Sequence, residues 1–152
     1  MDVDKILKTN KPLPLEGKTI IHLTLVHQHI SEKTTEALKP FDVSVQQFNV
    51  LRILKGQNGK AANLSTLNER MVSKMSNTTR LVDKLILKKL VKRSICPDNR
   101  RKIEIYITKK GKDELVKMSK AMLNMEELLL KNVTQEDLIS LNKLLNKLNT
   151  DN

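Results

Sequence analysis

The sequence is poor in residues on which several classes of protein depend. It has a single cysteine, so no disulfide can form within the chain, and a disulfide-stabilised secreted fold is excluded. Only 4 of its 152 residues are glycine, and no glycine-rich phosphate-binding loop stands out. The aromatic residues are Phe41, Phe48 and Tyr106, too few for the stacking platforms that bind single-stranded nucleic acid.

Long apolar runs and catalytic groupings are missing as well. No stretch approaches the roughly 20 apolar residues of a membrane-spanning helix, so no membrane association is expected. The first residues lack the basic-then-apolar pattern of a secretion signal, and with the single cysteine this favours the cytoplasm. No nucleophile paired with a base and no paired carboxylates stand out. The sequence therefore predicts a cytoplasmic protein that is not an enzyme and uses no cofactor.

Charge is abundant and unevenly distributed. The formal net charge is +11. Residues 52–112 hold seventeen basic and four acidic side chains, whereas residues 1–51 hold six of each and residues 113–152 hold five and seven. A basic centre between near-neutral arms predicts a lobe that faces a polyanion, carried on segments with another role. Because aromatic residues are scarce, the expected polyanion is double-stranded DNA.

The central basic stretch, residues 73–93, has the pattern of an amphipathic helix with Ser73 as its N-cap. Inward-facing side chains recur at helical spacing: Met75, Thr78, Leu81, Val82 and Leu85. They alternate with side chains that pair with phosphates or base edges: Lys74, Ser76, Asn77, Thr79, Arg80 and Lys84. A solvated amphipathic helix is the ordinary explanation of such a pattern, so the helix alone does not establish nucleic-acid binding.

Two shorter helices are predicted before this one. Residues 44–56 open with a capping box formed by Ser44 and Gln47. Residues 64–72 follow a polar loop, with Asn63 as the expected cap. Two short helices followed by a basic helix have the spacing of a helix-turn-helix.

After the basic helix the apolar period changes from 3.6 to 2. Isoleucine occupies every second position within residues 102–108, which indicates a half-buried strand, and residues 91–95 can pair with it. The connecting residues 97–101 are a charged turn sequence. Within this hairpin we expect Asp98 to order the tip and leave Arg100 free to enter a minor groove. The wing residues predicted to lie at DNA are Arg93, Asp98, Arg100, Arg101 and Lys102.

The flanking segments are predicted to be long apolar helices. Residues 18–39 are apolar on more than one side, and Pro40 should end that helix. Thr108 caps a helix whose methionines and leucines follow a 3-4 spacing, and Thr134 opens a last helix with the same spacing. Such helices, nearly neutral in charge, favour a homodimer. The methionines are typical of core packing rather than of a cofactor site.

These elements predict a mainly α fold with a small β-hairpin wing. A winged helix-turn-helix DNA-binding lobe occupies residues 41–108. Residues 1–40 and 109–152 form a helical dimerisation lobe, continuous with it as one structural unit.

The chain resembles the MarR family, the dimeric bacterial winged-helix transcriptional repressors and activators. The resemblance is carried by Gln47 and Phe48 and by six segments: residues 51–54, 67–70, 76–85, 90–93, 96–101 and 108–111. The resemblance implies a dimeric, sequence-specific regulator on a palindromic operator, with residues 76–84 in the major groove. It also implies modulation by a small apolar or phenolic effector, although the scarcity of aromatic residues leaves no pocket identifiable from sequence.

Some positions depart from the family or suggest other sites. Lys89 stands where the family usually has glycine, and a left-handed backbone there would cost lysine roughly 1 kcal/mol. Cys96 lies in the wing, whereas thiol sensors resembling this family keep a cysteine near the first helix. His22 and His29 share a helix face, but His27 points elsewhere and no cysteine or carboxylate joins them at ligand spacing, so no metal site is expected.

Two other functions fit a winged helix. One is a nucleoid-type protein that binds duplex DNA without sequence preference, and the other is a protein-binding module. Ser76, Asn77 and Thr79 favour base reading over purely electrostatic binding, which needs only lysine and arginine. The three consecutive basic residues 100–102 are more than a protein-binding wing requires.

Overall fold

The computed structural model describes residues 3–8, 13–72, 77–96 and 99–148, with side chains of residues 5, 7 and 99–102 left undescribed. The elements are α1 (Val3–Leu7), α2 (Leu15–Leu38), η1 (Lys39–Phe41), α3 (Val45–Gly56), α4 (Leu64–Arg70), α5 (Thr78–Leu87), β1 (Val91–Cys96), β2 (Asn99–Ile107), α6 (Lys109–Leu130) and α7 (Gln135–Leu148). Helices with one antiparallel hairpin confirm the predicted fold class. Within the described ranges, no helix is long and apolar enough to cross a membrane.

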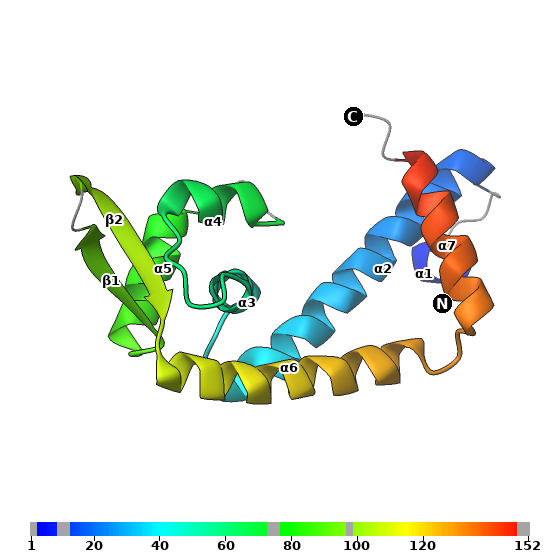
Figure 1. Ribbon diagram of the computed structural model, residues 1–152. Coiled ribbons are helices and arrows are strands. Elements are labelled where there is room, and N and C mark those ends of the chain that lie inside the picture. The colour runs from blue at the N-terminus through cyan, green and yellow to red at the C-terminus, as the bar shows by residue number, and fades with distance from the viewer. Residues whose placement is uncertain (1–2, 9–12, 73–76, 97–98, 149–152) are drawn as a thin grey trace.

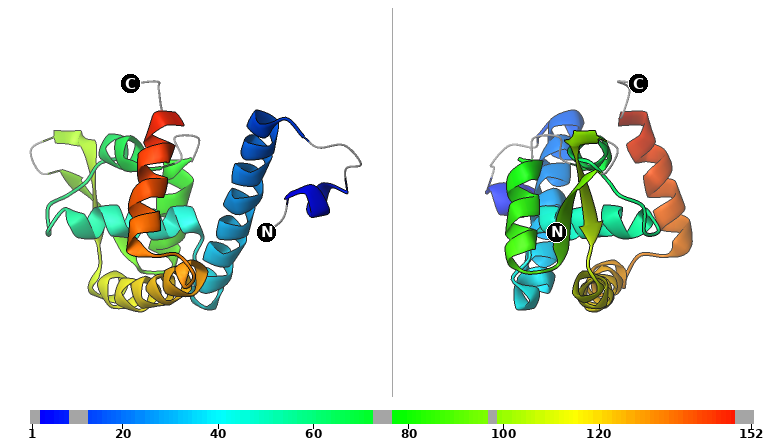
Figure 2. Two further views of the ribbon diagram at one scale, coloured as in Figure 1. Left: turned by 90° about the vertical axis from the view of Figure 1, so that its right-hand side faces the viewer. Right: turned by 60° about the vertical axis from the view of Figure 1, so that its left-hand side comes forward.

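Two long helices, α2 and α6, diverge from a common base (Figure 1). The helices α3, α4 and α5 and the hairpin gather at one end of the molecule, above the start of α6. At the other end α7 turns back from the end of α6, and it stands apart from α2 when the molecule is turned (Figure 2). The chain is therefore a compact lobe at one end with long helical arms extending from it.

The hydrophobic core lies in the compact lobe. Its fully buried large side chains come from several elements: Leu38, Leu51, Leu54, Leu67, Leu85, Ile105, Leu115 and Met118. Leu115 and Met118 belong to α6, so the first half of this helix packs on the same core as α3 and α5. Burying one such side chain contributes roughly 1.5–3 kcal/mol, which makes this lobe the main source of stability.

Local capping decides where several helices begin. Ser44 and Gln47 form both bonds of the predicted capping box at the start of α3, with N–O distances of 3.2 and 3.0 Å. Asn63 caps α4 and Thr108 caps α6, as predicted. Met71 is buried, but α4 ends at Arg70, two residues earlier than predicted, because the backbone of Met71 is extended.

The hairpin pairs the two predicted strands. Val91 faces Ile107 and Ile95 faces Ile103, with a register irregularity after Ile95. The second strand begins at Asn99, three residues earlier than predicted. Ile105, on the other edge of β2, exchanges backbone hydrogen bonds of 2.8 and 3.0 Å with Ala62. This bridge ties the wing to the segment that leads into α4.

Candidate nucleic-acid interface

The predicted recognition helix begins later than the sequence suggested. Its N-cap is Asn77, whose side-chain oxygen accepts the Arg80 backbone N–H at 3.2 Å. The prediction of Ser73 as the cap of this helix is therefore wrong, and Ser73 itself lies outside the described residues. A tertiary contact coincides with this start, because the buried Thr78 hydroxyl donates to the side chain of Asn68 on α4. Serine and asparagine are both good caps, so local preference could not choose between them.

The helix also ends earlier, at Leu87 rather than at residue 93. Lys89 has φ +60°, a left-handed conformation that terminates a helix. Its carbonyl accepts the Thr108 hydroxyl at 2.8 Å, so the turn is held from the start of α6. The left-handed backbone considered for Lys89 in the sequence is therefore present.

The two faces of α5 divide as the pattern predicted. Val82 and Leu85 are buried in the core of the lobe. Thr79, Arg80 and Lys84 are exposed on the same helix. The helix is thus seated on the core by its apolar side and presents a basic, hydroxyl-bearing side to solvent, the arrangement that a recognition helix needs.

Asn77 caps the helix, and this limits the hydrogen bonds that its side chain can make to DNA. Its amide oxygen is engaged by the Arg80 N–H. A bidentate asparagine contact with adenine needs that oxygen as an acceptor and the amide nitrogen as a donor. While it caps the helix, Asn77 offers the amide N–H groups for a contact.

Arg93 connects the wing to the recognition helix. Its guanidinium donates to the carboxylate of Asp83 on α5, and the two side chains remain 42% and 47% exposed. The sequence prediction placed Arg93 among the DNA-contacting residues and missed Asp83. The structure assigns the guanidinium an internal partner, so Arg93 orients the hairpin against α5.

A second set of contacts stiffens the hairpin. The Lys92 ammonium lies 5.6 Å from the centroid of the Tyr106 ring, its partner across the strands. The Tyr106 hydroxyl donates to Glu104 at 2.7 Å, and this hydrogen bond raises the pKa of Tyr106 above its usual value. These contacts link Lys92, Tyr106 and Glu104 across the hairpin.

Several predicted site residues fall outside what the structure describes. These are Lys74, Ser76 and Asp98, and the side chains of Arg100, Arg101 and Lys102, whose backbone lies in β2. The three histidines are exposed on α2: His22, His27 and His29. In the described part of the chain, no three His, Cys, Asp or Glu side chains gather to hold a metal ion.

A helix-turn-helix seated on a buried core, with a hairpin beside its second helix and a strongly basic middle segment, defines a winged-helix DNA-binding protein. The family model "MarR family" matches residues 43–103, which cover most of this lobe. Residues 43–103 thus match the MarR family of transcriptional regulators, the family that the sequence resembles.

Comparisons with individual proteins extend the similarity beyond the segment that the family model matches. The HTH-type transcriptional repressor IacR of Pseudomonas putida is 25% identical over 123 residues, which cover 81% of this chain and 72% of that protein. The apo structure of wild-type MarR from E. coli has 25% identity and a TM-score of 0.68, over 92% of this chain and 99% of that one. The organohalide-sensing regulator RdhR, in its 2,4-dichlorophenol-bound form, has 22% identity and a TM-score of 0.80, over 91% and 85%.

Proposed function

We propose that this protein is a cytoplasmic homodimer that binds a palindromic operator in duplex DNA and regulates transcription there. The observation that carries the proposal is α5, whose Val82 and Leu85 are buried while Thr79, Arg80 and Lys84 face solvent. One side of the helix is fixed and the other is free to enter a major groove.

Each interface residue has a proposed role. Arg80 and Lys84 pair with phosphates or guanine edges, and Thr79 and the amide of Asn77 reach base edges or backbone oxygens. Lys74 and Ser76 extend this surface toward the first turn. The wing would add Asp98, Arg100, Arg101 and Lys102, with Arg100 entering the minor groove. Arg93 contributes by holding the wing through Asp83.

The helical arms are proposed to form the dimer. Residues 1–40 and 109–152 would be the dimerisation lobe, and residues 41–108 the DNA-binding lobe. None of the residues of α7, all of which are described, is buried, and its exposed apolar side chains are Ile139, Leu141, Leu144, Leu145 and Leu148. An apolar helix face this extensive marks a protein interface. Two-fold symmetry would then present two recognition helices to one palindrome.

A small apolar or phenolic effector is proposed to modulate DNA binding. The structure of RdhR, which shares this fold, contains 2,4-dichlorophenol. In this chain a cavity of about 290 Å³ lies between α3 and α6. Its wall includes Phe48, with the Arg52 guanidinium carbon 5.8 Å from the ring centroid, and Met122. Glu126 also lines this cavity, so its mixture of apolar and charged side chains suits a neutral phenol, whose hydroxyl can donate to a carboxylate, better than a phenolate.

Selection of bound duplexes from a random pool tests the proposal. We expect enrichment of a palindrome whose half-sites are about one DNA turn apart. Retained binding without enrichment would favour a nucleoid-type protein, and the absence of DNA binding would favour a protein-binding module. Adding 2,4-dichlorophenol to the complex with the enriched duplex then tests the effector, with loss of binding as the expected result.

A further inference from the structure

The end of the recognition helix is bonded to the corner between α2 and α3. Lys88 is the C-cap of α5, and its ammonium lies 2.6 Å from the Asp42 carboxylate oxygen Oδ2. The same ammonium also donates to the backbone carbonyl of Asp42. Because both acceptors belong to one residue, Lys88 holds the side chain and the backbone of the corner at once.

The corner has a specialised conformation. Asp42 has φ +52° and ψ +41°, a left-handed conformation that few residues other than glycine adopt, and its N–H donates to the Lys39 carbonyl at 3.0 Å. Asp42 ends η1, the short turn that contains Pro40 and redirects the chain from α2 into α3. Lys88 is therefore bonded to the residue at which the chain changes direction between α2 and α3.

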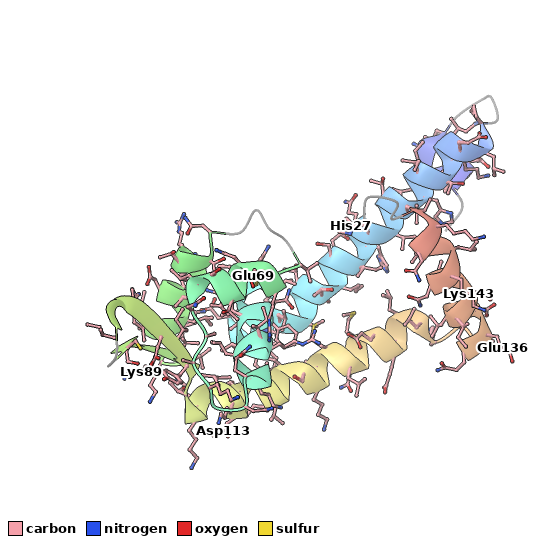
Figure 3. All side chains as sticks on the ribbon, turned by 45° about the horizontal axis from the view of Figure 1, so that its top comes forward. His27, Glu69, Lys89, Asp113, Glu136 and Lys143 are labelled. Carbon is pink, nitrogen blue, oxygen red and sulfur yellow. The ribbon has the colours of Figure 1, made fainter. Side chains whose placement is uncertain are left out.

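Lys88 is also fixed from the side of α6. Its carbonyl accepts the Lys110 ammonium at 3.2 Å. Two residues further on, the Leu90 carbonyl oxygen would lie 2.1 Å from a Cβ atom at Gly111, so backbone packs on backbone there. Lys89 and Asp113 lie at this end of the molecule, where the hairpin meets the start of α6 (Figure 3). The end of α5 and the start of α6 thus behave as one body, and Lys88 joins that body to the corner after α2.

We propose that Lys88 and Asp42 are positioning residues that fix the recognition helix relative to α2 and thereby select the spacing of the two operator half-sites. The inference rests on the proposed palindrome-binding homodimer. In a two-fold dimer, a rotation of the winged-helix lobe about the corner occurs in both subunits and changes the separation of the two recognition helices. The pair then governs half-site spacing, while the exposed face of α5 governs base sequence.

This role differs from ordinary stabilisation by an ion pair. The Asp42 side chain is 96% exposed, and pairs in such positions contribute little to the free energy of unfolding. The Lys88 hydrogen bond lowers the pKa of Asp42, so the carboxylate is charged at neutral pH. Breaking the pair should therefore leave the protein folded and loosen the angle between the lobes.

The first test measures affinity for duplexes that carry two selected half-sites at the native spacing or displaced by one or two base pairs. The wild-type protein should prefer the native spacing by at least about tenfold, since each base pair rotates one half-site relative to the other. Lys88→Met should reduce that preference to about threefold or less, with unchanged affinity for a single half-site. Asp42→Asn removes the charge but keeps the acceptors, so it should reduce the preference less than Lys88→Met does. Asparagine is chosen because it tolerates the left-handed backbone.

Two variants serve as controls. Lys88→Arg keeps a donor at this position and should restore the wild-type spacing preference. Lys117→Met removes a similar exposed ion pair, 2.7 Å from Glu114, that lies within α6 and joins no second element, so the preference should not change. A Lys88→Met protein that keeps the wild-type spacing preference would overturn the proposal.

A second measurement needs no DNA. Spin labels at Ser31→Cys on α2 and Thr79→Cys on α5, in a Cys96→Ser background, report the distance between the lobes within one chain when labelled protein is diluted with unlabelled protein. We expect a narrow distance distribution that broadens in Lys88→Met, and an unchanged distribution would reject the positioning role. If the wild type shows no spacing preference, the palindromic operator is rejected, and the label distances then decide alone whether Lys88 positions the lobes.

Discussion

At the scale of single residues, Arg80 is the side chain on which the interface depends most directly. It is exposed on α5, and its backbone N–H already serves the Asn77 cap, so its guanidinium is the part available to a ligand. A guanidinium can pair with a phosphate or with a guanine edge, but the two contacts have different consequences. A phosphate contact acts on every sequence, whereas a guanine contact acts on one.

Arg80→Ala should weaken operator binding severely without unfolding the protein, because an exposed arginine contributes little to the core. A guanine contact would cost about 1–3 kcal/mol mainly on the cognate site, and a phosphate contact would weaken all duplexes alike and lower the salt slope by about one. Fluorescence anisotropy with operator and random duplex at several salt concentrations distinguishes them. Lys120→Ala removes the same charge from α6 as a control, and unchanged binding by Arg80→Ala would remove α5 from the groove.

The left-handed backbone of Lys89 destabilises the folded state, and a single substitution should remove this effect. Its φ of +60° costs a non-glycine residue about 1–2 kcal/mol, and glycine in its place loses roughly 0.5–1 kcal/mol through greater freedom of the unfolded chain. Lys89→Gly should therefore raise the free energy of unfolding by about 0.5 kcal/mol, measured by urea denaturation. Lys89→Ala keeps the Cβ atom and should not stabilise; equal stabilisation by both variants would show that lysine charge, not backbone strain, is the cause.

At the scale of elements, one residue at the N-terminus of α5, Asn77, both stabilises the helix and is proposed to contact DNA. Asn77 caps the helix through its oxygen and presents its amide N–H groups. Asn77→Ala should cost about 1 kcal/mol of stability because the cap is lost. Asn77→Asp keeps the acceptor and places a negative charge at the positive end of the helix, which is favourable for folding.

Stability and DNA affinity should change in opposite directions in the aspartate variant. We expect Asn77→Asp to be as stable as the wild type or slightly more stable, yet to bind DNA more weakly than Asn77→Ala, since a carboxylate repels phosphate and cannot donate. Thermal denaturation and anisotropy on the same samples give both values. Wild-type affinity in Asn77→Asp would mean that this amide does not face DNA.

The elements that the sequence predicted well are those with local signals. The capping box of Ser44 and Gln47 and the cap at Thr108 need only residues three positions apart, and the isoleucine alternation before Thr108 needs only one strand. The start of α5 coincides instead with a hydrogen bond from Thr78 to Asn68, ten residues earlier in the chain, and no local pattern contains that contact.

The same distinction between local signals and long-range contacts explains which residues of the candidate site could be predicted from the sequence. The exposed face of α5 follows from helical periodicity, so Arg80 and Lys84 could be placed from sequence. The partner of Arg93 could not, because Asp83 becomes its neighbour when the chain reverses between α5 and β1. The Lys88–Asp42 contact joins residues 46 positions apart and left no signal in the composition or spacing.

At the scale of the whole molecule, α7 leaves large apolar side chains exposed in the single chain. On α7, Leu141 is 46% exposed and Leu145 is 38% exposed, and they lie four residues apart on one side of the helix. Figure 3 shows Lys143 on the same helix, far from the hairpin. A partner that covers this face must leave the winged-helix lobe free, and a second copy of the chain joined through its own arms satisfies that condition.

Replacing both leucines by glutamate should separate the subunits without unfolding them. The double variant Leu141→Glu and Leu145→Glu changes residues that are exposed in the single chain, so the buried core of the winged-helix lobe is untouched. Sedimentation at micromolar concentration should show a dimer for the wild type and a monomer for the variant. Because one subunit then contributes phosphate contacts where two did, the slope of log affinity against log salt should fall to about half. Lys143→Glu, which makes the same change in net charge at an exposed polar position, should leave the dimer and the slope intact. A double variant that remains dimeric, with the wild-type slope, would place the subunit interface elsewhere than α7.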